Sequence, residues 1–162
     1  MVSPVSMIKR GVVIDTGPLL IHAFSNFKTG SLLPKVLSHI PESEHPKVTQ
    51  VLSALLSNTR RVLVTPQVFT EFQVVAQNRA RFSGQALGEF LLASLPIFQK
   101  AEHPSVSFSD LVEFKSKANS WNLSFVDISL LWAAKVSGLP ILTIDGPLTI
   151  RCRQLRLRVL HL

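Results

Sequence analysis

The sequence has little charge, a single cysteine and no long hydrophobic run. Charged residues make up only 17% of its 162 residues, below the usual quarter, so each one is informative. Cys152 cannot form an internal disulfide, which is consistent with a reducing compartment. No stretch approaches the roughly 20 apolar residues of a membrane span. The start, "MVSPVSMIKR", has no long apolar run before its charges and is therefore not a signal peptide. We expect a cytoplasmic protein that does not enter a membrane.

Acidic residues are scarcer than basic ones. Lys and Arg total 17 against 10 Asp and Glu, which gives a net charge of +7. Such an excess favours an anionic partner, namely nucleic acid, an acidic protein or anionic lipid. Four arginines near the C-terminus either contact phosphate or form a solvated face: Arg151, Arg153, Arg156 and Arg158. No interleaving of aromatic and basic residues marks a base-stacking surface, so no residue is assigned to nucleic-acid binding.

Short apolar runs alternate with helical patterns, which predicts an α/β fold with a mainly parallel sheet. Hydrophobic residues make up 46% of the chain, enough for one core. We expect a flexible N-terminus over 1–10 and a single domain over 11–162. The expected strands are 12–14, 62–64, part of 95–103, 141–144 and 159–160. The expected helices are about 18–24, 66–80, 84–94, 109–120, 127–137 and 148–155.

The section between the first two strands is predicted to be a helical insertion near 31–58. Apolar residues recur at helical spacing over 33–40 and again over 48–56. These two stripes either belong to the core or form an interface with a partner or a second copy.

Four of the ten acidic residues lie in strongly apolar surroundings. Asp15 follows "VVI", Glu71 lies in "VFTEFQVV", Asp127 lies in "SFVDISLLW", and Asp145 follows "ILTI". A carboxylate in such a place is costly unless it is paired, hydrogen-bonded or bound to metal. Ligands of open parallel sheets bind at the carboxyl ends of the strands. All four residues can reach that edge, because two of them end strands and two lie early in helices.

Each of the three aspartates also has a purely structural interpretation. Asp15 can cap the helix near Pro18, and Asp145 can cap the helix that follows it. Asp127 can complete a capping box with Ser124, three residues earlier. Glu71 lies beyond the first turn of its helix and is harder to explain in this way. The residues alone leave both interpretations open.

A shared cleft of four carboxylates would need a cation. At an effective dielectric near 20, one pair about 4 Å apart costs roughly 4 kcal/mol. Mg²⁺ prefers oxygen ligands and needs only one or two direct carboxylates. Such a metal can activate a water and neutralise charge on a phosphoryl group. A basic surface around an acidic, metal-loaded cleft is typical of a nuclease.

Four stretches in order resemble the PIN-domain ribonucleases, over nearly the whole chain from Gly11 to Leu162. They are "VVIDTGPLL", "TPQVFTEF", "DISLLWAAKVSGLPILTID" and the tail "LRLRVLHL". The resemblance implies a three-layer α/β/α sandwich around about five mainly parallel strands. It also implies a hydrolase, a Mg²⁺- or Mn²⁺-dependent endonuclease that cuts RNA. Catalysis and metal binding then fall to Asp15, Glu71, Asp127 and Asp145, with Thr16 and Thr143 in support.

The resemblance also implies partners. Many such proteins are toxins of toxin–antitoxin pairs, inhibited by an antitoxin protein, and many form homodimers. This chain departs from the compact toxins in its longer helical segment near 31–58. It also has Gly17 where many relatives carry a small hydroxylated residue.

Two other functions compete with the nuclease. A catalytically weak or inactive PIN-like module would bind RNA or a protein without cutting. A phosphatase would use Asp15 as its nucleophile, but that chemistry usually has a second Asp at the position of Gly17.

Overall fold

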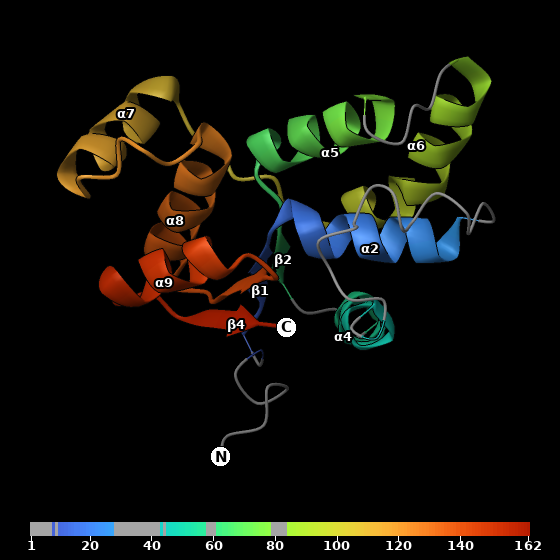
Figure 1. The fold of residues 1–162 in the computed structure, drawn as a ribbon, viewed down its shortest axis with the longest axis horizontal. Helices are drawn as coiled ribbons and strands as arrows, with labels where there is room; N and C mark the ends of the chain where they lie inside the picture. The colour runs from blue at the N-terminus through green and yellow to red at the C-terminus, as the bar shows by residue number, and fades with distance from the viewer. Residues whose placement is uncertain (1–7, 9, 28–42, 44, 58–60, 79–83) are drawn as a thin grey trace.

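A computed structural model describes residues 8, 10–27, 43, 45–57, 61–78 and 84–162 (Figure 1). Over these residues the chain forms a four-stranded parallel sheet of order β2-β1-β3-β4. The strands are β1 (Val12–Ile14), β2 (Val62–Leu63), β3 (Ile141–Thr143) and β4 (Val159–His161). The described helices are α2 (Thr16–Asn26), α4 (His45–Ser57), α5 (Pro66–Asn78), α6 (Gly84–Lys100), α7 (Phe108–Lys117), α8 (Phe125–Ser137) and α9 (Gly146–Gln154).

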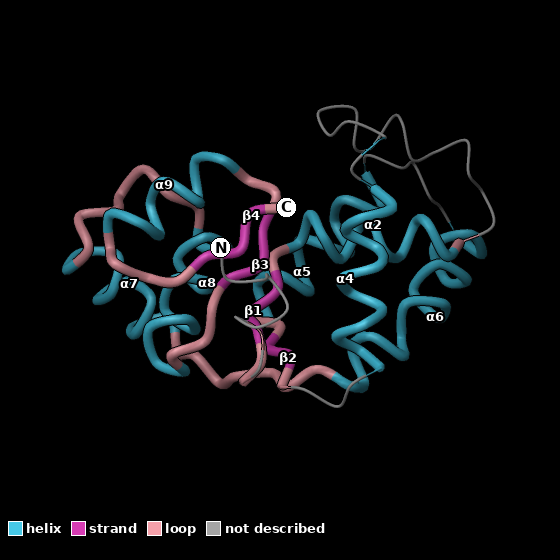
Figure 2. Tube along the Cα trace, turned by 90° about the horizontal axis from the view of Figure 1, so that it is seen from below, coloured by secondary structure: helices cyan, strands magenta, loops and turns pink. Residues whose placement is uncertain are grey.

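Strand β1 lies at the centre of the fold. Val13 pairs with Leu63 on one side and with Ile141 on the other. Every residue of β1, β2 and β3 is buried, as expected for short apolar strands covered on both faces. Helices α7, α8 and α9 lie to one side of the sheet, and α2, α4, α5 and α6 lie to the other (Figure 2). The predicted α/β class with a parallel sheet is therefore confirmed.

The predicted number of about five strands is wrong for the described residues, which contain four. The error lies at 95–103, where α6 continues as a helix to Lys100. Buried residues of α6 recur at helical spacing past Pro96, up to Ile97 and Phe98. Pro96 has no N–H to donate to the Leu92 carbonyl, and this hydrogen bond is missing on an exposed side of α6, where Leu92 is 69% exposed. Only an isolated bridge between Leu63 and Glu102 remains of the expected strand.

The helices beside β2 enclose a cluster of phenylalanines. Phe90 of α6 stacks on Phe24 of α2 at 4.7 Å and on Phe72 of α5 at 5.4 Å between ring centroids. Phe72 is fully buried, which fixes the rotation of α5 about its axis. Its sequence neighbour, Glu71, is held in place by this packing.

Helix α4 accounts for the described part of the predicted insertion. Its buried side chains include Val48, Leu52 and Leu55, so the stripe over 48–56 contributes to the core. The predicted stripe over 33–40 lies outside the described residues, as does the predicted flexible N-terminus except at residues 8 and 10. No helix in the described ranges is long and apolar enough to cross a bilayer.

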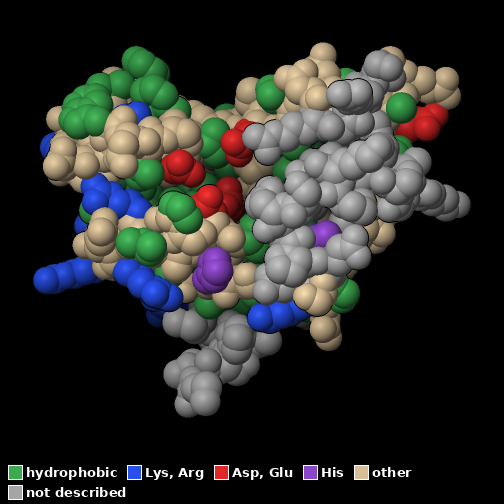
Figure 3. Space-filling model, viewed as in Figure 1, with side chains coloured by type: hydrophobic (Ala, Val, Ile, Leu, Met, Phe, Trp, Pro, Cys, Tyr) green, Lys and Arg blue, Asp and Glu red, His purple; other side chains and the backbone are tan. Residues whose placement is uncertain are grey.

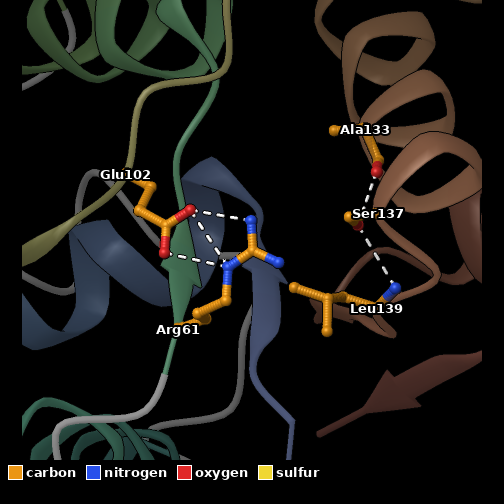
Figure 4. A network of polar contacts seen from close by, with 5 residues as sticks. All are labelled: Arg61, Glu102, Ala133, Ser137 and Leu139. Carbon is orange, nitrogen blue, oxygen red and sulfur yellow. Dashed lines mark hydrogen bonds and ion pairs between the residues drawn. The ribbon is translucent and has the colours of Figure 1, made fainter.

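Local contacts set the ends of the strands. Gly11 has φ +126°, and a Cβ there would lie 2.3 Å from the Arg61 carbonyl oxygen, so glycine lets β1 approach β2. The Arg61 guanidinium binds both carboxylate oxygens of Glu102 at 2.8 to 3.0 Å (Figure 4). Helix α8 ends at Gly138, which adopts the predicted left-handed cap with φ 68°. The Ser137 hydroxyl closes the same turn by accepting the Leu139 N–H at 3.2 Å (Figure 4).

Candidate active site

Asp15 follows the last residue of β1 and is buried, with 8% of its surface exposed. The Thr16 N–H donates to Asp15 Oδ1 at 2.6 Å, so Asp15 is the N-cap of α2. Helix α2 therefore begins two residues before the predicted start at Pro18. The Thr143 hydroxyl donates to the other oxygen, Oδ2, at 2.6 Å. Both oxygens are thus held in position, one from α2 and one from the end of β3.

The surroundings of Asp15 disfavour its charged form. Burial raises the pKa of Asp15 from 3.8 to about 7, although the hydrogen bonds from Thr143 and Thr16 oppose the shift. The negative charges of Asp127 and Glu71 raise this pKa further. The structure therefore brings three of the four predicted carboxylates close enough for their charges to interact.

Glu71 lies on α5 and is half-buried. The Thr16 hydroxyl donates to Glu71 Oε2 at 2.5 Å, so Thr16 contacts Asp15 through its backbone and Glu71 through its side chain. Helix α5 starts as predicted at Pro66, where the Thr65 hydroxyl accepts the Val68 N–H at 3.4 Å. Thr16, predicted as a supporting residue, links the start of α2 to α5.

Asp127 completes the capping box predicted from the sequence. The Ser124 hydroxyl donates to Asp127 Oδ2 at 2.8 Å, and the Asp127 N–H donates to Ser124 Oγ at 3.1 Å. Asp127 is half-buried and is the third residue of α8. The hydroxyls of Ser129 and Thr65 form a hydrogen bond of 2.7 Å, which joins α8 to α5. The sequence analysis missed Ser129, whose only signal is a lone hydroxyl in an apolar helix.

Asp145 follows the end of β3 and is linked to Asp15 through Thr143. It is exposed and caps α9, since the Leu148 N–H donates to its Oδ1 at 2.6 Å. Its own N–H donates to Thr143 Oγ1 at 2.9 Å. Thr143, named in the sequence analysis as a supporting residue, is fully buried, and its hydroxyl links Asp145 to Asp15.

An open groove lies beside Glu71. It encloses about 330 Å³ between α5 and α8, and its lining comprises Pro66, Gln67, Thr70, Glu71, Val74 and Val126. Glu71 is the one charged residue among these described lining residues. Figure 3 shows Asp and Glu side chains gathered near the centre of one face of the molecule. A ligand in the groove can therefore reach a carboxylate from solvent.

The carboxylates suit a hard divalent cation in their chemistry. Mg²⁺ takes carboxylate oxygens, keeps several waters and needs only one or two direct protein ligands. A cation would also relieve the repulsion that raises the pKa of Asp15. However, no group of three or more His, Cys, Asp or Glu side chains in the described part of the chain is arranged to hold a metal ion. The carboxylate oxygens are the type of ligand that Mg²⁺ prefers, but among the described residues they do not form a closed ligand shell.

Two of the C-terminal arginines hold backbone in place. Arg151 donates to the backbone carbonyl of Asn119 at 3.0 Å and to the Ser120 hydroxyl at 2.6 and 3.1 Å, and Arg158 donates to the carbonyl of Gly138. Cys152 is fully buried on α9. Burial, with the charges of Asp15 and Asp127, raises the pKa of its thiol to about 11, so the thiol is protonated at neutral pH and is a poor nucleophile.

The chain matches no protein-family model and no curated protein sequence. Its fold is similar to the crystal structure of PAE2754 from Pyrobaculum aerophilum, with a TM-score of 0.52 and 13% sequence identity. The similarity covers 86% of this chain and 84% of that one. At this identity the likeness concerns the fold alone.

Proposed function

We propose that this protein is a PIN-type endoribonuclease that needs Mg²⁺ or Mn²⁺ and hydrolyses RNA at the carboxylates beside β1. One observation carries the proposal. Asp15 is buried at the carboxyl end of the central strand, and the charges of Glu71 and Asp127 help to raise its pKa to about 7. A carboxylate whose pKa is shifted by burial and by like charges, next to an open groove, is a common mark of a functional site.

Helix capping does not account for this arrangement. Ser, Thr or Asn caps a helix as well as Asp does and carries no charge to be buried. Asp15 is instead buried and has the negative charges of Asp127 and Glu71 nearby. Its charged form therefore costs stability unless a cation or proton is bound. The three-layer α/β/α architecture implied by the resemblance belongs to the same proposal. Helices on both sides of a parallel sheet support it (Figure 2).

In this proposal the carboxylates bind the metal, and the hydroxyls of Thr143 and Thr16 orient the carboxylates. Asp15 and Asp127 would hold the cation, with Glu71 and Asp145 acting directly or through water. When bound, such a cation supplies an activated water and offsets charge on the phosphoryl oxygens. The Thr143 hydroxyl keeps Asp15 Oδ2 in one orientation, and the Thr16 hydroxyl does the same for Glu71 Oε2. Glu71, on the open groove, positions the attacking water.

The charge of the chain supports RNA as the substrate. A net charge of +7 attracts a polyanion, while Glu71 lines the groove between α5 and α8. An antitoxin protein and a homodimer are further proposals from the same resemblance. Growth arrest on expression, relieved by a neighbouring gene, would support the toxin assignment. Light scattering in solution would measure the oligomeric state.

A second candidate function is a PIN-like module that binds RNA or a protein without cutting. The observation in its favour is that Asp15, Asp127 and Asp145 all cap helices. The absence of a three-ligand metal group among the described residues points the same way. RNA binding that does not respond to Mg²⁺, with no cleavage, would establish this alternative.

The experiment compares wild-type protein with Asp15→Asn on end-labelled single-stranded RNA. Asn retains an oxygen for the Thr16 N–H, and its amide can donate to Thr143 Oγ1, so α2 stays capped. We expect wild-type protein to cut RNA with Mg²⁺ and not with EDTA, and Asp15→Asn to cut with neither. Equal cleavage by the two proteins would refute the assignment.

A further inference from the structure

Two aromatic rings are exposed together beside the candidate active site. Phe108, the first residue of α7, is 71% exposed, and Phe125, the first residue of α8, is 38% exposed. Their ring centroids are 5.3 Å apart and their planes are tilted by 36°. The residues are far apart in the sequence, so the sequence analysis found no such pair. Large apolar side chains exposed in contact with each other mark a binding surface.

The pair adjoins the carboxylates through the first turn of α8. Phe125 begins that turn and Asp127 is its third residue. Val126, between them, lines the groove that contains Glu71. The helix rises about 1.5 Å per residue, so the backbone positions of Phe125 and Asp127 are about 3 Å apart along the axis of α8.

Lys115 of α7 fixes the orientation of one ring. Its Nζ donates to the Leu123 carbonyl at 2.6 Å and lies 4.7 Å from the Phe125 ring centroid. Lys115 is buried, with 9% of its surface exposed. A cation against an aromatic ring is attracted to it and restricts its motion. Phe125 is therefore a preorganised support, and Phe108 presents most of its ring to solvent.

The size of the pair favours a small planar ligand over a protein. An aromatic side chain buries about 150–250 Å² in total, whereas a stable interface buries about 800 Å² on each partner. Two rings are therefore too small an area for a protein partner to bind by them alone. A nucleobase matches one ring in size and shape. Base stacking on aromatic side chains is also tolerant of sequence.

We propose that Phe108 and Phe125 form a stacking subsite for one base of a single-stranded RNA whose backbone passes Asp127. This inference rests on the proposed function, because it takes RNA as the ligand. The subsite holds the strand against the carboxylates, and Asp127 and its neighbours act on the adjacent phosphodiester.

The test measures binding of a fluorescent single-stranded RNA decamer by anisotropy, in EDTA so that cleavage does not interfere. We expect Phe108→Leu, which keeps an apolar side chain but loses the ring, to bind about tenfold more weakly than wild type. Phe108→Trp should retain wild-type affinity, because indole stacks at least as well. Leu92→Ala, at a 69% exposed position on α6, is the matched control and should bind normally. Circular dichroism checks that each variant is folded.

The outcomes separate the subsite from the proposed function. Wild-type affinity in Phe108→Leu, or no RNA binding by wild type, would overturn the subsite. So would a change from dimer to monomer in Phe108→Leu, since the rings would then belong to a protein interface. Cleavage with Mg²⁺ is measured on its own with wild type and Asp127→Asn. If wild type cleaves RNA but Phe108→Leu binds RNA as tightly as wild type does, only the subsite is refuted. Weaker binding by Phe108→Leu without any cleavage refutes only the nuclease.

Discussion

The capping boxes of α7 and α8 have the same residue types, spacing and geometry. In α7 the Ser107 hydroxyl donates to Asp110 Oδ2 at 2.6 Å and accepts the Asp110 N–H at 3.1 Å. In α8 the corresponding distances between Ser124 and Asp127 are 2.8 and 3.1 Å. Each box satisfies backbone groups at a helix start that have no partner within the helix.

The two aspartates differ in their surroundings. Asp110 is exposed, and the hydrogen bonds from Ser107 hold its pKa below the usual range. Asp127 is half-buried, and its charge contributes to the raised pKa of Asp15. The same local motif is therefore purely structural in α7 and part of a candidate site in α8. What separates them is the tertiary contact with the end of β1, which a capping motif does not encode.

The largest expected effect is on the free energy of unfolding, which depends on pH through the buried carboxylate of Asp15. The folded-state pKa of Asp15 is about 7, above the 3.8 of an unperturbed aspartate, so the folded protein binds the proton more tightly than the unfolded chain. Wild-type stability should therefore fall as pH rises from about 4 to about 7, by roughly 4 kcal/mol in total. Asp15→Asn has no such proton to lose. In EDTA the variant should thus be more stable than wild type at pH 8, and urea unfolding across this pH range measures the difference.

Asp110→Asn is the contrasting variant for that experiment. The pKa of Asp110 is lowered, so its contribution to stability is present above the unfolded-state pKa and is lost as pH falls. The two aspartate variants should therefore depart from wild type in opposite directions at neutral pH. A wild-type curve parallel to that of Asp15→Asn between pH 4 and 8 would contradict the account of Asp15.

The next effect is stabilisation by Mg²⁺. A cation bound only to the folded state adds about 2.7 kcal/mol at about a hundred times its dissociation constant. Wild-type protein and Asp110→Asn should gain this stability equally at pH 8. Thermal unfolding with and without Mg²⁺ measures the gain. Asp15→Asn and Asp127→Asn should gain little. An equal gain in all four proteins would mean that Mg²⁺ binds elsewhere.

The smallest effect concerns the caps themselves. Ser107→Ala and Ser124→Ala each remove one N-cap hydroxyl, which costs about 1 kcal/mol. Because the two boxes share one geometry, the losses in unfolding free energy should agree within a few tenths of a kcal/mol. A much larger loss in Ser124→Ala would show that this hydroxyl also supports the candidate site.

Local signals predicted most of the secondary structure. Thr65-Pro66 and Gly138 mark helix ends by their own backbone and side-chain chemistry, and both ends are found as predicted. The strand predicted at 95–103 was wrong, because α6 continues past Pro96 to Lys100. Phe98 continues the buried face of α6 beyond Pro96, and tertiary burial outweighed the local preference.

The site was predictable only in part. The alternation of strands and helices predicted that Asp15 and Asp127 reach one edge of the sheet. In the structure the charge of Asp127 contributes to the raised pKa of Asp15. The exposure of Asp145 was not foreseen, because a position at the end of a strand does not determine how much of the side chain is buried. The pairing of Phe108 with Phe125 depends on how α7 packs against α8 and left no sequence pattern.

The most direct test of the central claim replaces each of the two matched aspartates by asparagine and measures RNA cleavage with Mg²⁺. Both Asp127→Asn and Asp110→Asn keep an amide oxygen for the capping serine, so their folds should match wild type. If Asp127 belongs to a metal-dependent site, Asp127→Asn should cut RNA at least about a hundredfold more slowly, and Asp110→Asn should cut at the wild-type rate. Equal rates for the two variants would contradict the claim that the carboxylates beside β1 form a nuclease site.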